Sequence, residues 1–518
     1  MKIVVIITTF FLLPYHHLIG QEIPIVHSKI VDEFVLRNYN VIRDNHISLS
    51  HGYFTIDDLL YVSEVVKDKE PSFFDWYSSE YDISLLDMEL TAPIGTLYNI
   101  RKIFSNNDHA VVHPRFLSYR DDHLIISMDW LEKYSIESHG SNNRSYFKDQ
   151  VIIYGLYENV SFYSDFTMIR MQNTDISYSF PEYRGEHIQD YEEKDWFIWD
   201  RSQMSIRYNL NWLNIELNKL PIILGPGRGT SPLLSGNTQP ISHIYLSTQY
   251  KNLHFSHFHG SLIHYGNESY KKIAGHRIDL KITNNSILSF TELVIYNRPH
   301  FELGYSLPLN LIWSEEHNLG NKDNMLMALD GVVQLTNSFK VYGTFLWDEM
   351  YWVKLFKDWW GNKYVLQTGM HWKPFQEMHL PDLNIEYSLA RPWTYTHNDT
   401  TITYTSAGVD LGLPFGPNSQ TISLKSNIFI SSRTFFQLQY MHSVKGTEIG
   451  SNSTDNYDLR NKDLDDNTPM LLGDLIVSNK FKIIANHAVS KMLKFNCIIE
   501  YNDQIDDLYA SGSFVIDL

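Results

Sequence analysis

The stretch RIDLKIT at residues 277–283 alternates polar and apolar side chains without a break. Ile278, Leu280 and Ile282 point to one face of an extended strand, and the residues between them point to the other face. This period of two is typical of a β-strand with one apolar and one polar face. The fold class therefore depends on how many such strands the chain contains and on what covers their apolar faces.

The same alternation recurs along the chain from about residue 110 onward. It is clear in WLNIELNK (212–219), KVYGTFLWD (340–348) and LKFNCIIEY (493–501). Roughly 18 to 20 such runs of about ten residues match the length that a tilted strand needs to cross a membrane. A soluble sandwich has far fewer strands, and a soluble propeller would show a repeat of about 40 residues, which is not seen. The sequence predicts an all-β, transmembrane outer-membrane β-barrel of about 18 antiparallel strands.

The first part of the chain follows other patterns. Lys2, the apolar run 3–13 and the small residue Gly20 are typical of a secretory signal peptide. A membrane anchor is the alternative, which the short apolar run disfavours. The segment TIDDLLYVSEVVK (55–67) has one apolar helical face, with Thr55 as a helix-capping residue. We expect a signal peptide at 1–20, an N-terminal helical periplasmic segment at 21–95 and the barrel at 96–518.

The net charge, the aromatic content and the cysteine count of the chain limit the classes of protein to which it can belong. The formal net charge is −18, so the chain lacks the basic surface that nucleic acid requires. Tyrosine (33), phenylalanine (28) and tryptophan (12) are abundant, as they are where barrels meet the two membrane interfaces. The single cysteine, Cys497, fits a bacterial export product whose fold closes by backbone pairing. We therefore expect outer-membrane lipid as a partner and no nucleic acid.

Four segments are too polar to be strands and are predicted to be loops. They are residues 137–149, 183–195, 314–324 and 445–469. The last is long and acidic, as functional surface loops often are.

The stretch GPGRGT (225–230) raises the question of a phosphate-binding loop. A dinucleotide fingerprint needs G-x-G-x-x-G before a helix, and a Walker loop needs G-K-[S/T]; this stretch has neither. We interpret Gly225, Pro226 and Gly227 as structural residues of a tight loop between two strands. Glycine accepts a positive φ there, and proline fixes one turn residue.

Other polar residues allow two interpretations each. His257 and His259 share one strand face, and either bind a metal or, as we favour, line the barrel interior. Charged residues on the polar strand faces, such as Arg277, Glu292 and Asp348, are either acid–base groups or, as we favour, ion pairs that line the lumen. The motifs G-x-S-x-G and H-E-x-x-H do not occur. We expect no catalytic residues, no metal and no cofactor.

Several blocks of the sequence, taken in order, resemble the capsule assembly Wzi family of bacterial outer-membrane proteins. The most distinctive is GPGRGTSPLLSGNTQPISHIYL (225–246). The others follow in the family's order: HGSL (259–262), HRIDL (276–280), TELVIY (291–296), YSLPLNLIWSEE (305–316), DNMLMALD (323–330), VYGTFLWDE (341–349), WWGNKY (359–364), IEYSLARPWTYTH (385–397) and GLPFGPNSQ (412–420).

The resemblance implies a monomeric barrel of about eighteen strands in a Gram-negative outer membrane, with a small periplasmic helical bundle. It implies a non-catalytic role in which the protein binds or organises capsular polysaccharide or exopolysaccharide at the cell surface. We expect the ligand to contact Arg228, His276, Arg277, Glu292 and Asp348, because such groups hydrogen-bond sugar hydroxyls or carboxylates. The alternative is an outer-membrane porin for small polar solutes.

Overall fold

The computed structural model describes two short strands near the N-terminus and most of the chain from Phe116 to Asp517. The described residues are 24–25, 54–55 and 116–517, without 121–122, 140–141, 173–182, 192–195, 211, 229, 265–269, 350, 356, 375–379, 432–433, 490–492 and 505. β1 (Pro24–Ile25) pairs antiparallel with β2 (Phe54–Thr55). Thr55, expected to cap a helix, lies in β2. The signal peptide and the rest of the expected helical segment lie outside the described residues.

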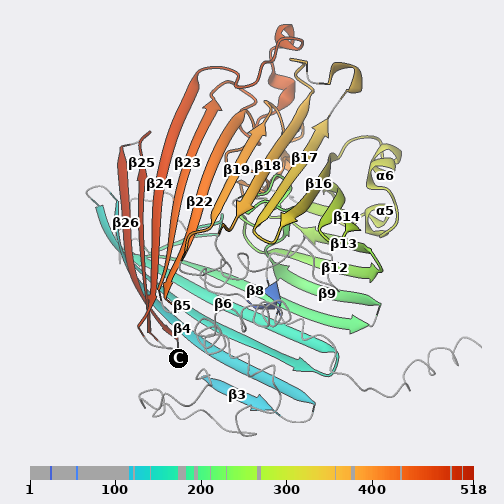
Figure 1. Ribbon diagram of the computed structural model, residues 1–518. Helices are drawn as coiled ribbons and strands as arrows, with labels where there is room; N and C mark the ends of the chain where they lie inside the picture. The colour runs from blue at the N-terminus through green and yellow to red at the C-terminus, as the bar shows by residue number, and fades with distance from the viewer. Residues whose placement is uncertain are drawn as a thin grey trace, which may run out of the picture.

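Most of the described chain forms one closed barrel (Figure 1). Eighteen strands pair antiparallel in sequence order, and the last pairs with the first to close the wall. They are β4 (Leu124–His139), β5 (Asn142–Tyr157), β6 (Val160–Gln172), β8 (Trp196–Leu210), β9 (Leu213–Leu220), β12 (Ile241–Tyr250), β13 (Leu253–Ser261), β14 (Lys271–Thr283), β15 (Ser286–Asn297), β16 (Asn324–Thr336), β17 (Phe339–Glu349), β18 (Lys363–Trp372), β19 (Leu383–Ala390), β22 (Ser419–Ser431), β23 (Thr434–Gly446), β24 (Leu475–Ala488), β25 (Leu493–Asn502) and β26 (Asp507–Asp517). The predicted fold class and strand number are confirmed.

The longest connections between strands all lie at one end of the barrel. Short turns such as 158–159 and 284–285 lie at one end of the barrel, which we call the short-turn end. The opposite, long-loop end carries the connections 173–195, 221–240, 298–323, 391–418 and 447–474. Since neighbouring strands are antiparallel, every long connection meets the others at one end.

The remaining elements are small. β3 (Leu117–Arg120) pairs with β4, and β7 (Gln189–Tyr191) pairs with β8. The long connections contain β10 (Ile223–Leu224), β11 (Leu234–Ser235), α5 (Leu303–Ser306), α6 (Ile312–Asn318), η4 (Trp352–Lys354), η5 (Thr400–Ile402), β20 (Thr405–Ser406), β21 (Val409–Asp410), η6 (Tyr457–Leu459) and η7 (Lys462–Leu464). None of the helices in the described part of the chain is long and apolar enough to cross a membrane.

The alternation in β14 has the predicted consequence. Ile278, Leu280 and Ile282 are exposed on the outer surface of the barrel, whereas Arg277 and Asp279 are buried in its lumen. An exposed apolar outer surface on a closed barrel suits contact with lipid, because closure pairs the backbone groups of every strand.

The prediction of a loop at 137–149 is wrong. β4 extends to His139, and β5 begins at Asn142. Glu137 and Arg144 face each other across the two strands and form a buried ion pair, with 2.6 Å between Oε2 and Nε. Polar residues on the lumen face do not end a strand, because another polar group satisfies them there.

A closed barrel of this size should be heat-modifiable. It offers detergent no free strand edge at which to start unpairing. We expect the purified protein to migrate faster in a denaturing gel when unheated than after boiling. Equal mobility of the two samples would contradict the closed wall.

Candidate functional site

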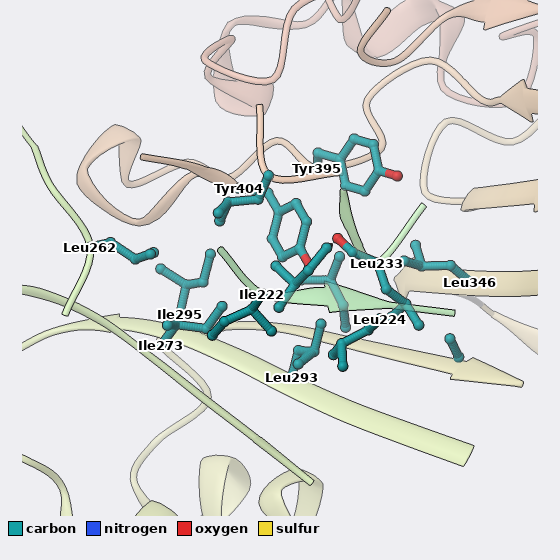
Figure 2. Close-up of a cluster of buried hydrophobic side chains, with 14 of the residues drawn as sticks. Ile222, Leu224, Leu233, Leu262, Ile273, Leu293, Ile295, Leu346, Tyr395 and Tyr404 are labelled. Atoms are coloured by element: carbon teal, nitrogen blue, oxygen red, sulfur yellow. The ribbon is translucent and has the colours of Figure 1, made fainter. Parts of the chain in front are cut away.

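The lumen is filled at the long-loop end by two connections that fold inward. The hairpin of β10 and β11 and the loop 391–418 pack their apolar side chains against the lumen face of β12–β19 (Figure 2). We call these two connections the plug. Its buried side chains include Ile222, Leu224, Leu233, Leu234, Tyr395, Ile402, Tyr404, Leu411 and Leu413, and the wall contributes Ile273, Leu293, Ile295 and Leu346 among others.

Two stacked tyrosines hold the halves of the plug together. The rings of Tyr395 and Tyr404 lie 5.1 Å apart and nearly parallel. Their hydroxyls donate to the carbonyl oxygens of Pro232 and Leu233, each at 2.7 Å. Burial raises the pKa of both hydroxyls well above the usual value, so they remain protonated donors. The plug therefore combines an apolar core with satisfied backbone acceptors.

Gly225 and Gly227, in the hairpin of β10 and β11, have different roles. Gly225 has φ +102°, the left-handed conformation that favours glycine. Gly227 does not share this conformation, so a positive φ is not the reason for glycine there. Instead, a Cβ at Gly227 would lie 2.1 Å from the carbonyl oxygen of Thr230 and 2.7 Å from Oε1 of Gln367. Pro226, between them, is half-buried.

Arg228 follows at the point where the hairpin meets the wall. Its backbone N–H donates to Oε1 of Glu386 at 2.6 Å, and the same oxygen accepts from the hydroxyl of Tyr342 at 2.8 Å. Gln367 donates from Nε2 to the carbonyl oxygen of Thr230 at 2.9 Å. The GPGRGT stretch is thus bonded to β18 and β19, and the Arg228 side chain is half-buried beside it.

Arg277 lies deeper in the lumen, inside a network of buried charges. Its Nη1 and Nη2 donate to the two carboxylate oxygens of Asp330 at 2.7 and 2.8 Å, and its Nε donates to Asp279 at 2.8 Å. Asp279 also accepts from Ser289 at 2.6 Å and lies 3.1 Å from Nδ1 of His254. All five side chains are buried, as expected for an ion-pair network of the lumen.

Asp348 lies at the end of β17 and bonds to the plug. Its Oδ2 accepts from the backbone N–H of Tyr395 at 2.8 Å. It therefore positions the loop that carries the stacked tyrosines.

His276 and Glu292 lie on the other side of the wall. They pair with each other across β14 and β15, in the same alternation as the exposed Ile278. His257 pairs with His276 and also faces outward, as does His259. The expectation that Glu292, His257 and His259 face the lumen is wrong, because α5 and α6 cover this part of the outer wall and bury it.

The five residues expected to contact ligand are therefore not brought together. Arg228, Arg277 and Asp348 occupy three positions in the lumen, and His276 and Glu292 lie outside it. No three His, Cys, Asp or Glu side chains within the described ranges are grouped so that they could hold a metal ion.

A group of aromatic and cationic side chains lies at the long-loop end, beyond the plug. We call it the rim cluster: Trp359, Trp360, Lys363, His397, Tyr457 and Arg460. Three connections contribute to it, those from β17 to β18, β19 to β22 and β23 to β24.

The rim cluster is held by stacked contacts. The Arg460 guanidinium lies 3.6 Å from the ring centre of Trp360, and Lys363 Nζ lies 4.0 Å from that of Tyr457. Trp360 and Tyr457 are 5.6 Å apart. Burial lowers the pKa of His397, so that its ring is neutral at pH 7.

Carboxylates partly offset the two cations of the rim cluster. Arg460 pairs with Asp465 at 2.9 Å, and Lys363 pairs with Glu349 at 3.1 Å. Aromatic rings beside mixed hydrogen-bonding groups suit a ligand with apolar faces and many hydroxyls, as a sugar has. Sequence reasoning missed this cluster, although the WWGNKY block contains half of it.

The architecture defines the class of protein: a membrane-spanning β-barrel of the outer-membrane type, with the long-loop end outside the cell and the short turns in the periplasm. No protein-family model matches the chain, and no curated protein sequence matches it.

The chain is similar in fold to Wzi of Escherichia coli, an outer-membrane protein involved in group 1 capsule assembly and described as a carbohydrate-binding β-barrel. The TM-score is 0.58 at 11% identity, over 95% of this chain and 99% of that one. OprD of Pseudomonas aeruginosa (TM-score 0.41, 9% identity, 76% of this chain and 95% of that one) and OpdQ of the same organism (0.41, 8%, 77% and 99%) are also similar. The resemblance noted in the sequence is confirmed at the level of the fold.

Proposed function

We propose that this protein binds or organises surface polysaccharide, capsular or exopolysaccharide, at the outer face of the outer membrane, without catalysis. The observation that carries the proposal is the plug. Its apolar core occupies the lumen at the long-loop end, where a porin needs a water-filled path. Attachment at the surface is a role that a filled barrel can perform.

The rim cluster is the proposed contact surface for the polysaccharide. Trp360 and Tyr457 offer ring faces and edges, and the partly exposed Arg460 offers donors to hydroxyl or carboxylate groups, whereas the fully buried Lys363 supports the Tyr457 ring from within. Wzi, which has a similar fold, is described as binding carbohydrate. Arg228, Arg277 and Asp348 take a supporting part in this proposal, because they order the lumen and the plug beneath the rim cluster.

The proposal includes the remaining expectations for the whole chain. The protein is exported with removal of residues 1–20, carries a periplasmic segment at 21–95 and works as a monomer surrounded by outer-membrane lipid. A single chain already closes the wall, so no second copy is needed to complete the barrel.

Replacing Trp360 tests the proposed contact. We expect Trp360→Ala to weaken binding of surface polysaccharide, purified from the source bacterium, by about ten-fold, equivalent to about 1.4 kcal/mol. Trp360→Phe should retain most of the affinity because it keeps an aromatic face. Isothermal titration calorimetry with the purified protein measures the effect.

The matched control is Trp212→Ala. Trp212 is an exposed tryptophan, but it lies far from the rim cluster, in the turn between β8 and β9 at the periplasmic end. Its loss should leave binding unchanged. Equal weakening by both variants, or none by Trp360→Ala, would contradict a site at the rim. Large and steady conductance of the unaltered protein in planar bilayers would favour the porin alternative.

A further inference from the structure

The connection 298–323 between β15 and β16 lies against the outside of the barrel, where Figure 1 shows α5 and α6 beside β14. We call this connection the outer flap. Its buried residues Tyr305 and Ile312 pack with Ala274, Val294 and Tyr296, which belong to the outer face of β14 and β15. The flap is thus a fixed part of the outer surface.

Beside this apolar cluster, the wall beneath the flap also carries polar side chains, unlike the wall nearer the short-turn end. Its outward positions hold His257, His259, His276 and Glu292, all buried. Facing lipid, Glu292 would lose its backbone N–H partner and the imidazole rings would be incompletely hydrogen-bonded, which is unfavourable for buried polar groups. Their position on the outer face therefore requires a cover.

The flap supplies hydrogen-bond partners for two of these polar groups. Glu292 accepts at Oε2 from the backbone N–H of Ile312 at 3.2 Å. Ser306 Oγ lies 2.9 Å from Nδ1 of His259, within hydrogen-bond distance. The flap also keeps its own charges paired where it joins the barrel, since Arg298 Nη2 lies 2.8 Å from Asp323 Oδ2.

Residues 301–313 of the flap expose apolar side chains, whereas the exposed residues that follow, Ser314, His317, Asn318 and Lys322, are polar. Leu309 is 88% exposed and Leu303 is 77% exposed. The exposed apolar side chains of the flap are Phe301, Leu303, Leu307, Leu309, Leu311 and Trp313. An exposed group of large apolar side chains on one short connection marks an interaction surface.

The patch continues the lipid-facing surface of the barrel. On the same outer face, nearer the periplasm, the wall exposes Leu280, Leu288 and Leu329 on β14, β15 and β16. The flap therefore covers the polar side chains of this wall section and presents the apolar side chains of residues 301–313 next to wall that already faces lipid.

We propose that the outer flap lies within the outer leaflet of the membrane, and that lipid acyl chains cover its apolar face. This extends the hydrophobic surface of β13–β16 toward the cell exterior, and it shields the buried histidines and Glu292 from both lipid and water. A second copy of the chain is the competing occupant, and the test distinguishes the two.

Nitroxide labels on the flap test this placement in the full-length protein. In a Cys497→Ala background, Leu309→Cys is labelled and reconstituted into phosphatidylcholine–phosphatidylglycerol vesicles. Power-saturation EPR then compares collisions with oxygen, which partitions into lipid, and with a water-soluble nickel chelate. We expect the label at 309 to favour oxygen as strongly as a label introduced by Leu280→Cys, which faces lipid.

The water-side control is Leu459→Cys, because Leu459 is 70% exposed in the long-loop connection 447–474. Nickel accessibility at 309 equal to that at 459 would overturn the proposal. Spin–spin broadening at 309 would also overturn it, by placing a second copy there. Leu303→Cys provides a second flap position if the first variant fails the heat-modifiable mobility test for folding.

Discussion

Replacing Arg277 by alanine should destabilise the barrel by about 3–5 kcal/mol. The substitution leaves Asp279 and Asp330 charged, buried and without their guanidinium partner. Buried carboxylates of this kind pay a desolvation cost that only the ion pair offsets. We expect a large fall in the urea concentration at which half the protein loses its heat-modifiable mobility in lipid vesicles.

An exposed ion pair provides the matched control. Arg170 and Asp149 are joined at 2.6 Å, but their side chains are 41% and 27% exposed. Arg170→Ala should therefore cost about 1 kcal/mol or less. A triple variant with Arg277→Met, Asp279→Asn and Asp330→Asn should recover part of the stability lost in Arg277→Ala, because it removes the unpaired charges. Equal effects of Arg277→Ala and Arg170→Ala would contradict a structural role for the lumen network.

Replacing Gly227 by valine should displace the hairpin of the plug. The added Cβ would overlap the Thr230 carbonyl oxygen, and backbone atoms cannot move away as a flexible side chain can. Overpacking of this kind costs about 1–3 kcal/mol. We expect a lower yield of heat-modifiable protein, and the folded fraction should show a larger conductance in planar bilayers than the unaltered protein.

Gly512→Val is the control, because a Cβ at Gly512 on β26 meets no atom within 4 Å. It should leave folding and conductance unchanged. Arg228→Ala should also fold, since the N–H that bonds to Glu386 is retained. If Gly227→Val folded normally and stayed closed but lost polysaccharide binding, the glycines would contact ligand and the structural interpretation of the hairpin would be wrong.

The period-two pattern predicted the strands well, but it could not decide which face of a strand is inside. Ile278 and His276 lie on the same face of β14, yet one is exposed and the other is buried under the flap. A polar residue normally indicates the lumen, and this inference fails wherever a loop folds over the outer wall. Likewise, polarity at 137–149 predicted a loop, although Glu137 and Arg144 pair inside the barrel.

The rim cluster shows a different limit of sequence reasoning. Trp360, His397 and Tyr457 come from three connections that closure of the barrel brings to one end. No local sequence pattern predicts that residues so far apart in sequence lie close together in the structure. The spacing of the GPGRGT stretch predicts a structural loop. Its place inside the lumen depends on contacts with Tyr395 and Tyr404, which are far away in sequence.

That separation has a consequence for how the protein is assembled in the cell. Tyr404 bonds to a carbonyl 171 positions earlier, and Ser235 bonds to Leu411 across 176 positions. During synthesis, the hairpin is made long before its partner loop, so its leucines cannot be buried against residues 391–418 until that loop has been made. Contacts this distant in sequence carry a large loop-closure entropy, which slows folding. A chain interrupted between the two segments would also lack β22–β26, so neither the plug nor the wall can be completed until nearly the whole chain is present.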